Sequence, residues 1–254
     1  MRTLPSVSLK AVLRDAMHAL PGVKGPMWAA LLPAVLVMLL LSVWHIYAPL
    51  EQPLLQQLAL LTSPLFCSIL CAPFLLGALM VALRHCRHQP ISYRLGYTFW
   101  SSAGAAIRVL ILMELLINLP FWFLFFFIHA WPPIWMFIAI SLITLLIYAC
   151  FAWFLIALPI VGDKRAGALQ ALTLSYHLTR PIWLKCITLL LFTDGLLFVA
   201  LLPIALTLST HYVIWLCLGT FLTLGLLIWL VPYILLLHVV LYLHCTTRSH
   251  TPEA

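Results

Sequence analysis

Residues 109–163, VLILMELLINLPFWFLFFFIHAWPPIWMFIAISLITLLIYACFAWFLIALPIVGD, contain no lysine or arginine. One helix crossing a hydrocarbon core about 30 Å thick needs about 20 apolar residues, so this stretch is long enough for two crossings. A turn near 129–132 divides it. We therefore expect two membrane-spanning helices here, at about 105–128 and 133–161, joined as a hairpin.

The same pattern recurs on either side, because residues 25–83 and 186–247 also lack lysine and arginine. Apolar residues make up 65% of the chain and charged residues 7%, with a mean hydropathy of +1.15. An ordinary soluble domain is about half apolar and about a quarter charged, and a chain of this length has too much surface to hide the excess from water. The sequence predicts an all-α bundle in a single integral membrane domain, residues 1–254, with four further spans at about 27–48, 58–83, 184–208 and 212–243.

All thirteen basic residues fall on one side of these spans. The turns on the other side (near 49–57, 129–132 and 209–211) contain one charged residue, Glu51. By the positive-inside rule, we expect a multi-pass protein of the bacterial inner membrane with both termini in the cytoplasm. The basic residues are Arg2, Lys10, Arg14, Lys24, Arg84, Arg87, Arg94, Arg108, Lys164, Arg165, Arg180, Lys185 and Arg248.

The net charge of +7 is therefore explained by topology, and it does not favour a nucleic-acid partner. Nucleic-acid readers carry dense basic faces, whereas these cations flank apolar spans, where anionic lipid head groups are the natural contact. We expect membrane phospholipids as partners, no nucleic acid, and a second copy of the chain or another membrane protein as a further partner.

Amphipathic segments precede the hairpins. Residues 8–20 place apolar side chains at helical spacing, with Lys10 and Arg14 elsewhere around the wheel, which predicts a helix lying on the inner leaflet. Residues 165–179 repeat this pattern, and residues 91–103 form a weaker version. The chain then divides into three repeats of an interfacial helix plus a two-span hairpin, at about 1–85, 86–161 and 162–245.

Polar residues inside the spans are the best functional candidates, because an ionisable group within the bilayer costs about 2.5–3.5 kcal/mol on insertion scales. Glu114 and Asp194 qualify, and Asn118 follows Glu114 by four residues and shares its helix face. They form either a proton or cation relay or hydrogen-bonded packing contacts between helices.

Histidine and cysteine offer two further hypotheses. His45, His129 and His211 lie at the outer ends of spans, one per hairpin. Three imidazoles could converge on a metal such as zinc, although histidine also belongs at lipid interfaces because its ring is amphipathic. Residues 84–88 and 244–245 contain soft ligands beside arginines, which disfavour a cation. We expect no metal and no cofactor.

Catalytic signatures are missing from the chain, which has no G-x-S-x-G, HExxH, Walker or dinucleotide-binding motif. Residues 163–165 (Asp-Lys-Arg) read as a solvated charge run. Ser175 and His177 lie two positions apart on a helix, so their side chains point in different directions. We therefore expect a protein that is not an enzyme.

Residues 163–192, DKRAGALQALTLSYHLTRPIWLKCITLLLF, resemble an element of uncharacterised six-span bacterial inner-membrane proteins and of the membrane portion fused to some glycerophosphodiester phosphodiesterases. Residues 64–96 are similar to the preceding part of such proteins. The phosphodiesterase domain has no counterpart in this chain, so the resemblance implies a six-span, non-enzymatic membrane protein and no catalytic residue. The positions that carry it are Ala171, Leu172, Ser175, Trp183 and Lys185, with Pro73, Gly77 and Arg84 in the earlier segment.

Two functions remain. The first is a non-enzymatic, envelope- or lipid-associated protein whose interfacial cations contact lipid head groups. The alternative is a small secondary transporter that uses Glu114 and Asp194 as its relay. The predicted head-group contacts are Lys10, Arg14, Arg165 and Arg180.

Overall fold

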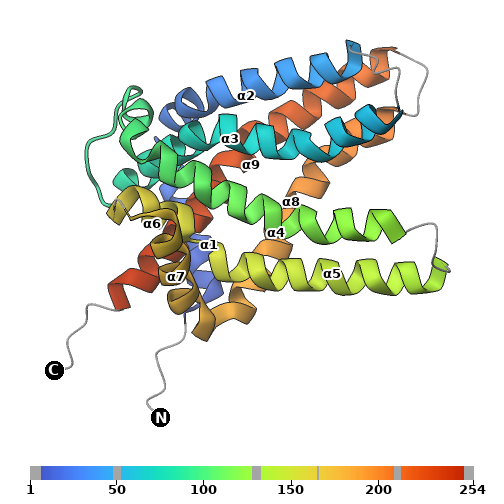
Figure 1. Ribbon diagram of the computed structural model, residues 1–254. Coiled ribbons are helices and arrows are strands. Elements are labelled where there is room, and N and C mark those ends of the chain that lie inside the picture. Colours follow the sequence, from blue (N-terminus) through green and yellow to red (C-terminus); the bar gives the residue numbers. More distant parts are fainter. Residues whose placement is uncertain (1–6, 48–52, 128–132, 165, 209–212, 249–254) are drawn as a thin grey trace.

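The computed structural model describes residues 7–47, 53–127, 133–164, 166–208 and 213–248, and within these ranges it contains helices and no strand (Figure 1). Six segments of the described chain are long and apolar enough to cross a membrane, in agreement with the six expected spans. The elements are α1 (Leu9–Ala19), α2 (Lys24–Tyr47), α3 (Pro53–Cys86), η1 (Leu95–Tyr97), η2 (Trp100–Ser102), α4 (Ala103–Phe127), α5 (Pro133–Phe154), α6 (Ala157–Lys164), α7 (Ala168–Thr179), η3 (Arg180–Ile182), α8 (Trp183–Leu208) and α9 (Val213–Arg248).

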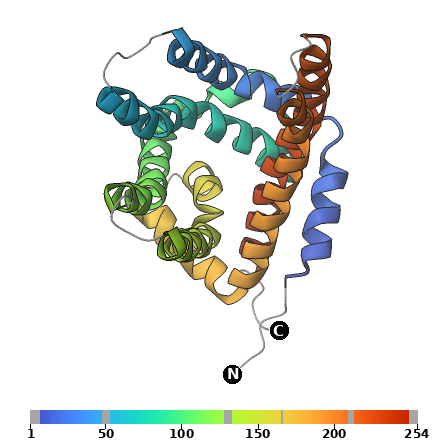
Figure 2. The same ribbon diagram turned by 90° about the vertical axis from the view of Figure 1, so that its right-hand side faces the viewer.

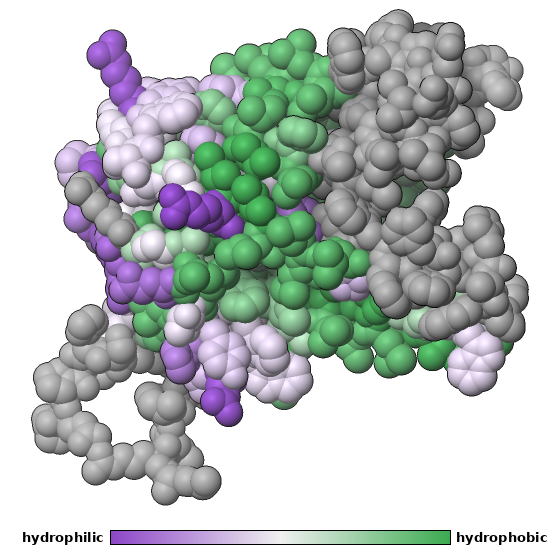
Figure 3. Space-filling view, in the orientation of Figure 1, coloured by the Kyte–Doolittle hydropathy of each residue, from purple (hydrophilic) through white to green (hydrophobic). Residues whose placement is uncertain are grey.

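The long helices form a ring (Figure 2). Along the ring α2 contacts α3, α3 contacts α4, α4 contacts α5, α5 contacts α8, and α8 contacts α9, which returns to α3. The short helices α1, α6 and α7 gather at one end, together with the last turns of α3 and α9 (Figure 1). We call this the basic end, because hydrophilic side chains concentrate there while the rest of the visible described surface is apolar (Figure 3).

Helix α6 lies inside the ring at the basic end (Figure 2). It contacts α3, α4, α7 and α9, and its residues Ala157 and Pro159–Gly162 are buried. The hydrophobic core surrounds it, formed mainly by residues 72–83 of α3 and 233–245 of α9. Towards the opposite end, large apolar side chains such as those of Phe137, Leu145 and Phe221 are exposed, as expected for helices solvated by lipid. The tightly packed part of the bundle is therefore its basic end.

Span 4 is not one helix, in contrast to the single span expected at 133–161. Helix α5 ends at Phe154 and α6 begins at Ala157. Pro159 lacks an N–H group, so it cannot donate to the carbonyl four residues earlier, and a helix is weakened at such a point. The break turns the chain inward and allows α6 to enter the ring.

The amphipathic segments have different structures. Residues 9–19 form α1, whose N-cap Ser8 accepts a hydrogen bond from the Ala11 amide at 3.4 Å, and residues 168–179 form α7, so both helices are confirmed. Residues 91–103 contain two 3₁₀ turns, η1 and η2, and the expectation of a weaker interfacial helix there is wrong. The threefold repeat and the placement of α1 on a leaflet stay predictions.

A close backbone approach explains the irregular segment before α4. An added Cβ on Gly77 of α3 would lie 2.1 Å from the Gly96 carbonyl oxygen, far inside van der Waals contact. The chain at η1 therefore lies directly on α3, and this contact requires glycine at position 77.

Candidate functional site

The most strongly connected polar group is at the basic end, around Asp163. Its Oδ1 accepts from Arg87 Nη1 at 2.5 Å, and its Oδ2 accepts from Arg87 Nη2 at 2.7 Å and from the Tyr242 hydroxyl at 2.5 Å. These contacts join the residue after α3 to α6 and α9. We call Arg87, Asp163 and Tyr242 the polar clamp.

The polar clamp corrects the interpretation of residues 163–165 as a solvated charge run. The side chain of Asp163 is 18% exposed and that of Arg87 36%, while Tyr242 is buried. The hydrogen bonds that Arg87 donates to Asp163 raise the pKa of Arg87, so its guanidinium stays charged. Lys164 is exposed, and Arg165 lies outside the described residues. Sequence spacing gave no sign of this pairing, because its members are far apart in the chain.

Glu114 lies on α4, where it faces α3. Its Oε1 accepts a hydrogen bond from the Ser68 hydroxyl at 2.7 Å. A carboxylate inside a membrane helix is costly unless polar groups of neighbouring helices satisfy it, and Ser68 supplies one such group. The side chain of Asn118 lies outside the described residues, so its place beside Glu114 stays a prediction.

Asp194 lies on α8 and is joined to α5. The Tyr148 hydroxyl donates to its Oδ2 at 2.5 Å. His238 of α9 is close enough to interact electrostatically with Asp194, and its Nδ1 lies 2.7 Å from the Ile234 carbonyl oxygen, so Nδ1 carries a proton and donates there. We call Asp194, its hydrogen-bond partner Tyr148 and the nearby His238 the polar cluster; the hydrogen bond within it joins Asp194 to Tyr148 of α5.

Sequence reasoning missed two members of this cluster. His238 is embedded in the apolar run of α9, and a histidine at such a position is the signal that could have drawn attention to it. Tyr148 had no comparable signal, since tyrosine is common in membrane helices. Glu114 and Asp194 each pair with a different neighbouring helix.

The described members of the predicted head-group set, Lys10, Arg14 and Arg180, lie at the basic end. Lys10 and Arg14 are exposed on α1, whereas Val12 and Ala16 on its other face are fully buried. Helix α1 packs against α9, so part of its apolar face contacts protein instead of lipid. Arg14 also lies 3.5 Å from Asp15.

Arg180, in the turn between α7 and α8, is the third described head-group candidate. It is exposed, and its guanidinium lies 5.9 Å from the centre of the Tyr176 ring. Together with Trp153 and Trp183, these two residues line a cavity of about 340 Å³. Aromatic rings beside a cation are typical of a membrane–water interface.

The break between α5 and α6 leaves the carbonyl of Trp153 without a helical partner. The hydroxyls of Ser175 and Thr179 both donate to it, each at 2.8 Å. Both residues are buried, and they tie α7 to the end of α5. The Ser175 hydroxyl is therefore committed to a structural bond.

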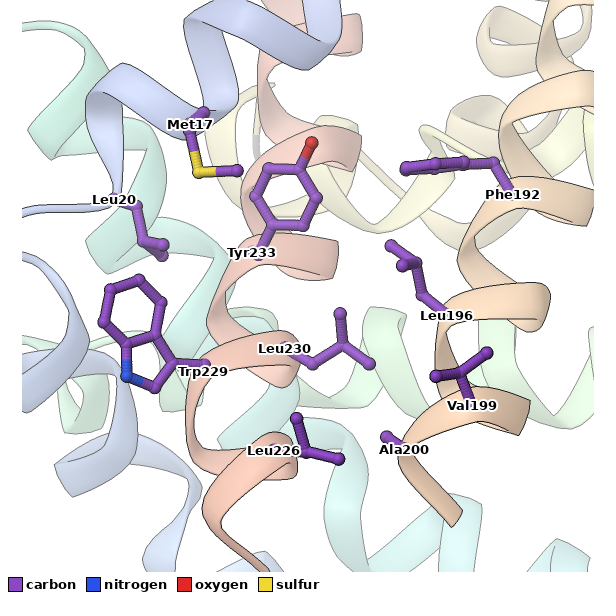
Figure 4. A pocket seen from close by; sticks show the side chains of 10 residues that line it. All are labelled: Met17, Leu20, Phe192, Leu196, Val199, Ala200, Leu226, Trp229, Leu230 and Tyr233. Atoms are coloured by element: carbon purple, nitrogen blue, oxygen red, sulfur yellow. The ribbon is translucent and has the colours of Figure 1, made fainter. Parts of the chain in front are cut away.

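A groove opens between α8, α9 and α1. Its volume is about 310 Å³, and ten side chains line it, all apolar except for Trp229 and Tyr233, whose rings carry one polar atom each (Figure 4). Tyr233 directs its hydroxyl to the Leu13 carbonyl oxygen at 3.4 Å. Neither the amphipathic pattern nor hydropathy predicted this groove, because it depends on how three helices meet.

Metal binding finds no support in the described part of the chain, where no group of three or more His, Cys, Asp or Glu side chains is placed to hold an ion. The side chains of His45, His129 and His211 lie outside the described residues, as does Glu51. His244 instead contacts Asp15, with Nε2 and Oδ2 3.1 Å apart, which links α9 to α1. This pair is one more contact that fixes the basic end.

Comparison of the chain with protein-family models, with curated proteins and with solved structures finds no match. The class of protein is therefore defined by the fold alone: within the described residues, it is an all-helical protein with six helices long and apolar enough to cross a membrane.

Proposed function

We propose that this protein is a non-enzymatic, multi-pass protein of the bacterial inner membrane that associates with phospholipid head groups through cytoplasmic cations. The observation that carries the proposal is the arrangement of α1. Lys10 and Arg14 are exposed while Val12 and Ala16 are anchored on the protein, so the cations are held at the surface at a fixed position. Each cation near an anionic leaflet contributes about 1 kcal/mol of attraction.

Arg180 supports the same role from a second element. It lies beside Trp183 and Tyr176, aromatic residues of the kind that occupy the head-group level of a bilayer. Its guanidinium presents a planar set of donors that matches a phosphate group. The proposal places the basic end in the cytoplasm, as the positive-inside rule predicts.

The absence of catalysis is part of the proposal. Ser175 lies two residues before His177 in sequence. Its hydroxyl is buried and bonded to a carbonyl oxygen, so it is not available as a nucleophile. The resemblance to the membrane portion of some glycerophosphodiester phosphodiesterases agrees with a role in the lipid phase, without an activity of its own.

Native mass spectrometry of the purified protein tests the head-group proposal. The protein is incubated with phosphatidylglycerol, and with phosphatidylcholine of the same acyl chains as the matched control. We expect preferential retention of phosphatidylglycerol, and loss of that preference when Lys10, Arg14, Arg165 and Arg180 are all replaced by glutamine. Equal retention of both lipids, or a preference that survives the four substitutions, would refute the proposal.

One observation favours a second candidate function, a secondary transporter. Asp194 lies in the apolar run of α8, accepts from Tyr148 and interacts with His238, so a carboxylate and an imidazole occur together inside the bundle. Such pairs occur in proton relays. Glu114 would serve as a separate step of the relay on α4.

Proteoliposomes with a pH-sensitive dye inside test the relay. If the protein moves protons, the Asp194→Asn and Glu114→Gln variants should each slow the flux, and Tyr148→Phe should slow it less because the carboxylate remains. Flux that persists in the protein with both acids replaced would eliminate the relay.

A further inference from the structure

The groove between α8, α9 and α1 has the chemistry of a hydrocarbon site. Leu196 and Val199 of α8 face Leu226 and Leu230 of α9 across it, and Met17 and Leu20 of α1 lie at one end (Figure 4). The Tyr233 hydroxyl is engaged with the Leu13 carbonyl and offers little to a polar ligand. A ligand inside the groove must therefore be apolar.

A cation contacts one of the side chains that line the groove. The ammonium of Lys24 lies 2.8 Å from the centre of the Trp229 ring, and Trp229 lines the groove. Lys24 follows Leu20 by four residues, and no acidic residue lies in the first turn of α2 to neutralise it. A cation held against an aromatic ring loses part of its hydration, which favours an anionic partner.

Other charged groups near the groove belong to α1. Arg14 precedes Met17 by three residues and so lies on the same side of the helix. Asp15, the nearest acid on α1, contacts His244 of α9, and Arg14 at 3.5 Å. The charged groups next to lining residues of the groove are thus Lys24, beside Trp229, and Arg14, one helical turn from Met17, together with Asp15, an acid that is already paired.

The size of the groove decides between occupants. A helix with its side chains is about 10 Å across, a cross-section of roughly 80 Å², so a volume near 310 Å³ would hold only about 4 Å of its length, less than one turn of 5.4 Å. A partner helix or a second copy could therefore enter it only with individual side chains. A single hydrocarbon chain, one carbon wide, can lie within it.

We infer that the groove holds one acyl chain of an anionic phospholipid, whose phosphate lies on Lys24 with Arg14 beside it. The inference rests on the proposed function, since it names one bound lipid and its position on a protein proposed to associate with head groups. It differs from that proposal in requiring a resident lipid between α8 and α9, in addition to lipids held at the surface by cations.

A phosphatidylglycerol with a diazirine on one acyl chain tests the inference on the full-length protein in nanodiscs. After illumination, peptide mass spectrometry should locate the label on residues that line the groove, such as Leu196 and Leu230. Val199→Trp should abolish this labelling, because the indole occupies the groove from an exposed position that tolerates a larger side chain. Leu202→Trp, exposed on α8 but outside the groove, is the matched control and should leave the labelling unchanged.

The role of Lys24 is tested in the same assay. Lys24→Gln should weaken labelling of the groove by about fivefold, the factor expected for one cation near an anionic lipid. Lys164→Gln removes another exposed cation of the basic end and should have no effect on the groove. Leu226→Trp offers a second blocking variant if Val199→Trp does not fold.

Three outcomes would overturn the inference. The first is label spread evenly over the exposed apolar residues of α8 and α9, and the second is labelling of the groove that neither Val199→Trp nor Leu226→Trp changes. The third is a dimer in native mass spectra that these substitutions dissociate. The outcome is separate from that of the head-group proposal. If replacing Lys10, Arg14, Arg165 and Arg180 leaves phosphatidylglycerol retention intact, the head-group proposal fails, while the effect of Val199→Trp still decides the groove.

Discussion

The polar clamp should contribute measurably to the stability of the bundle, and Arg87→Met tests this. Methionine keeps much of the aliphatic stem of Arg87 but removes its guanidinium. Of the two clamp residues that donate to Asp163, whose side chain is 18% exposed, Tyr242 then remains. Removing one partner of a fully buried ion pair costs about 3–5 kcal/mol, whereas an exposed pair contributes about 0.2–1 kcal/mol. Because Arg87 is 36% exposed, we expect an intermediate loss of about 2 kcal/mol.

Tyr242→Phe should cost about 1.5 kcal/mol, since it removes one hydrogen bond to a charged acceptor without leaving a cavity. In combination with Arg87→Met the loss should exceed the sum of the single losses, because Asp163 then lacks both donors. For a chain of this size, 2 kcal/mol corresponds to a fall in Tm of about 4–8 °C. Thermal unfolding of the purified protein in detergent, followed by intrinsic tryptophan fluorescence, measures the change.

Arg94→Met is the matched control, because Arg94 is an exposed arginine in the same connection between α3 and α4. It should change stability by no more than about 0.5 kcal/mol. If Arg87→Met and Arg94→Met unfold at the same temperature, the polar clamp does not hold α6 to α3 and the reasoning from its geometry is wrong.

The close approach on α3 predicts that Gly77→Ala lowers stability by about 1–3 kcal/mol, because the added methyl group meets backbone atoms that cannot move aside. The control is Gly104→Ala, where an added Cβ meets nothing within 4 Å. It should be neutral or slightly stabilising in the same thermal assay. Ser175→Ala alone should cost under about 1 kcal/mol, because the Thr179 hydroxyl still donates to the carbonyl at the end of α5. The double variant Ser175→Ala, Thr179→Val should cost about 1–3 kcal/mol, because that carbonyl then loses both hydroxyl donors. If the loss of the double variant equals the sum of the two single losses, the two hydroxyls do not substitute for each other and the reasoning is wrong. Lys185→Met removes the 2.7 Å hydrogen bond from the Lys185 ammonium to the Val7 carbonyl oxygen, just before α1. Amide hydrogen exchange in α1 should therefore become faster, while exchange in α4 stays unchanged. Equal protection of α1 in the variant and the original protein would contradict this role of Lys185.

Hydropathy predicted the six long helices because a membrane leaves the backbone few alternatives. Every N–H and C=O group in the hydrocarbon core must be satisfied within the helix, so a long apolar run without charges specifies a spanning helix almost regardless of its neighbours. Hydropathy could not predict the break at residues 155–156, because the run 133–161 is apolar throughout. The break is stabilised by the hydroxyls of Ser175 and Thr179 on α7, and no local pattern in the sequence connects these residues to it.

The candidate site was predictable only in part. Glu114 and Asp194 stand out in the sequence because a carboxylate inside a span is costly. Their hydrogen-bond partners Ser68 and Tyr148 are ordinary residues of apolar helices, and they became partners through the order of helices around the ring. Asp163 illustrates the opposite case, since two basic residues follow it in sequence and yet it pairs with Arg87 and Tyr242 on other helices.

Packing within a membrane explains why the basic end is the tightly packed part of the bundle. Lipid tails are as apolar as leucine, so helices there associate through small side chains that allow close approach and through polar contacts, without a hydrophobic driving force. Both features concentrate at this end: Gly162 of α6 lies so close to the Met80 side chain of α3 that a Cβ would clash with it, and the polar clamp lies at the same end. Farther from it, α5, α8 and the first half of α9 present large apolar side chains to the surroundings. Under the proposed function and the inferred lipid, the exposed cations of the basic end would contact a head group, while the groove between α8, α9 and α1 would hold an acyl chain.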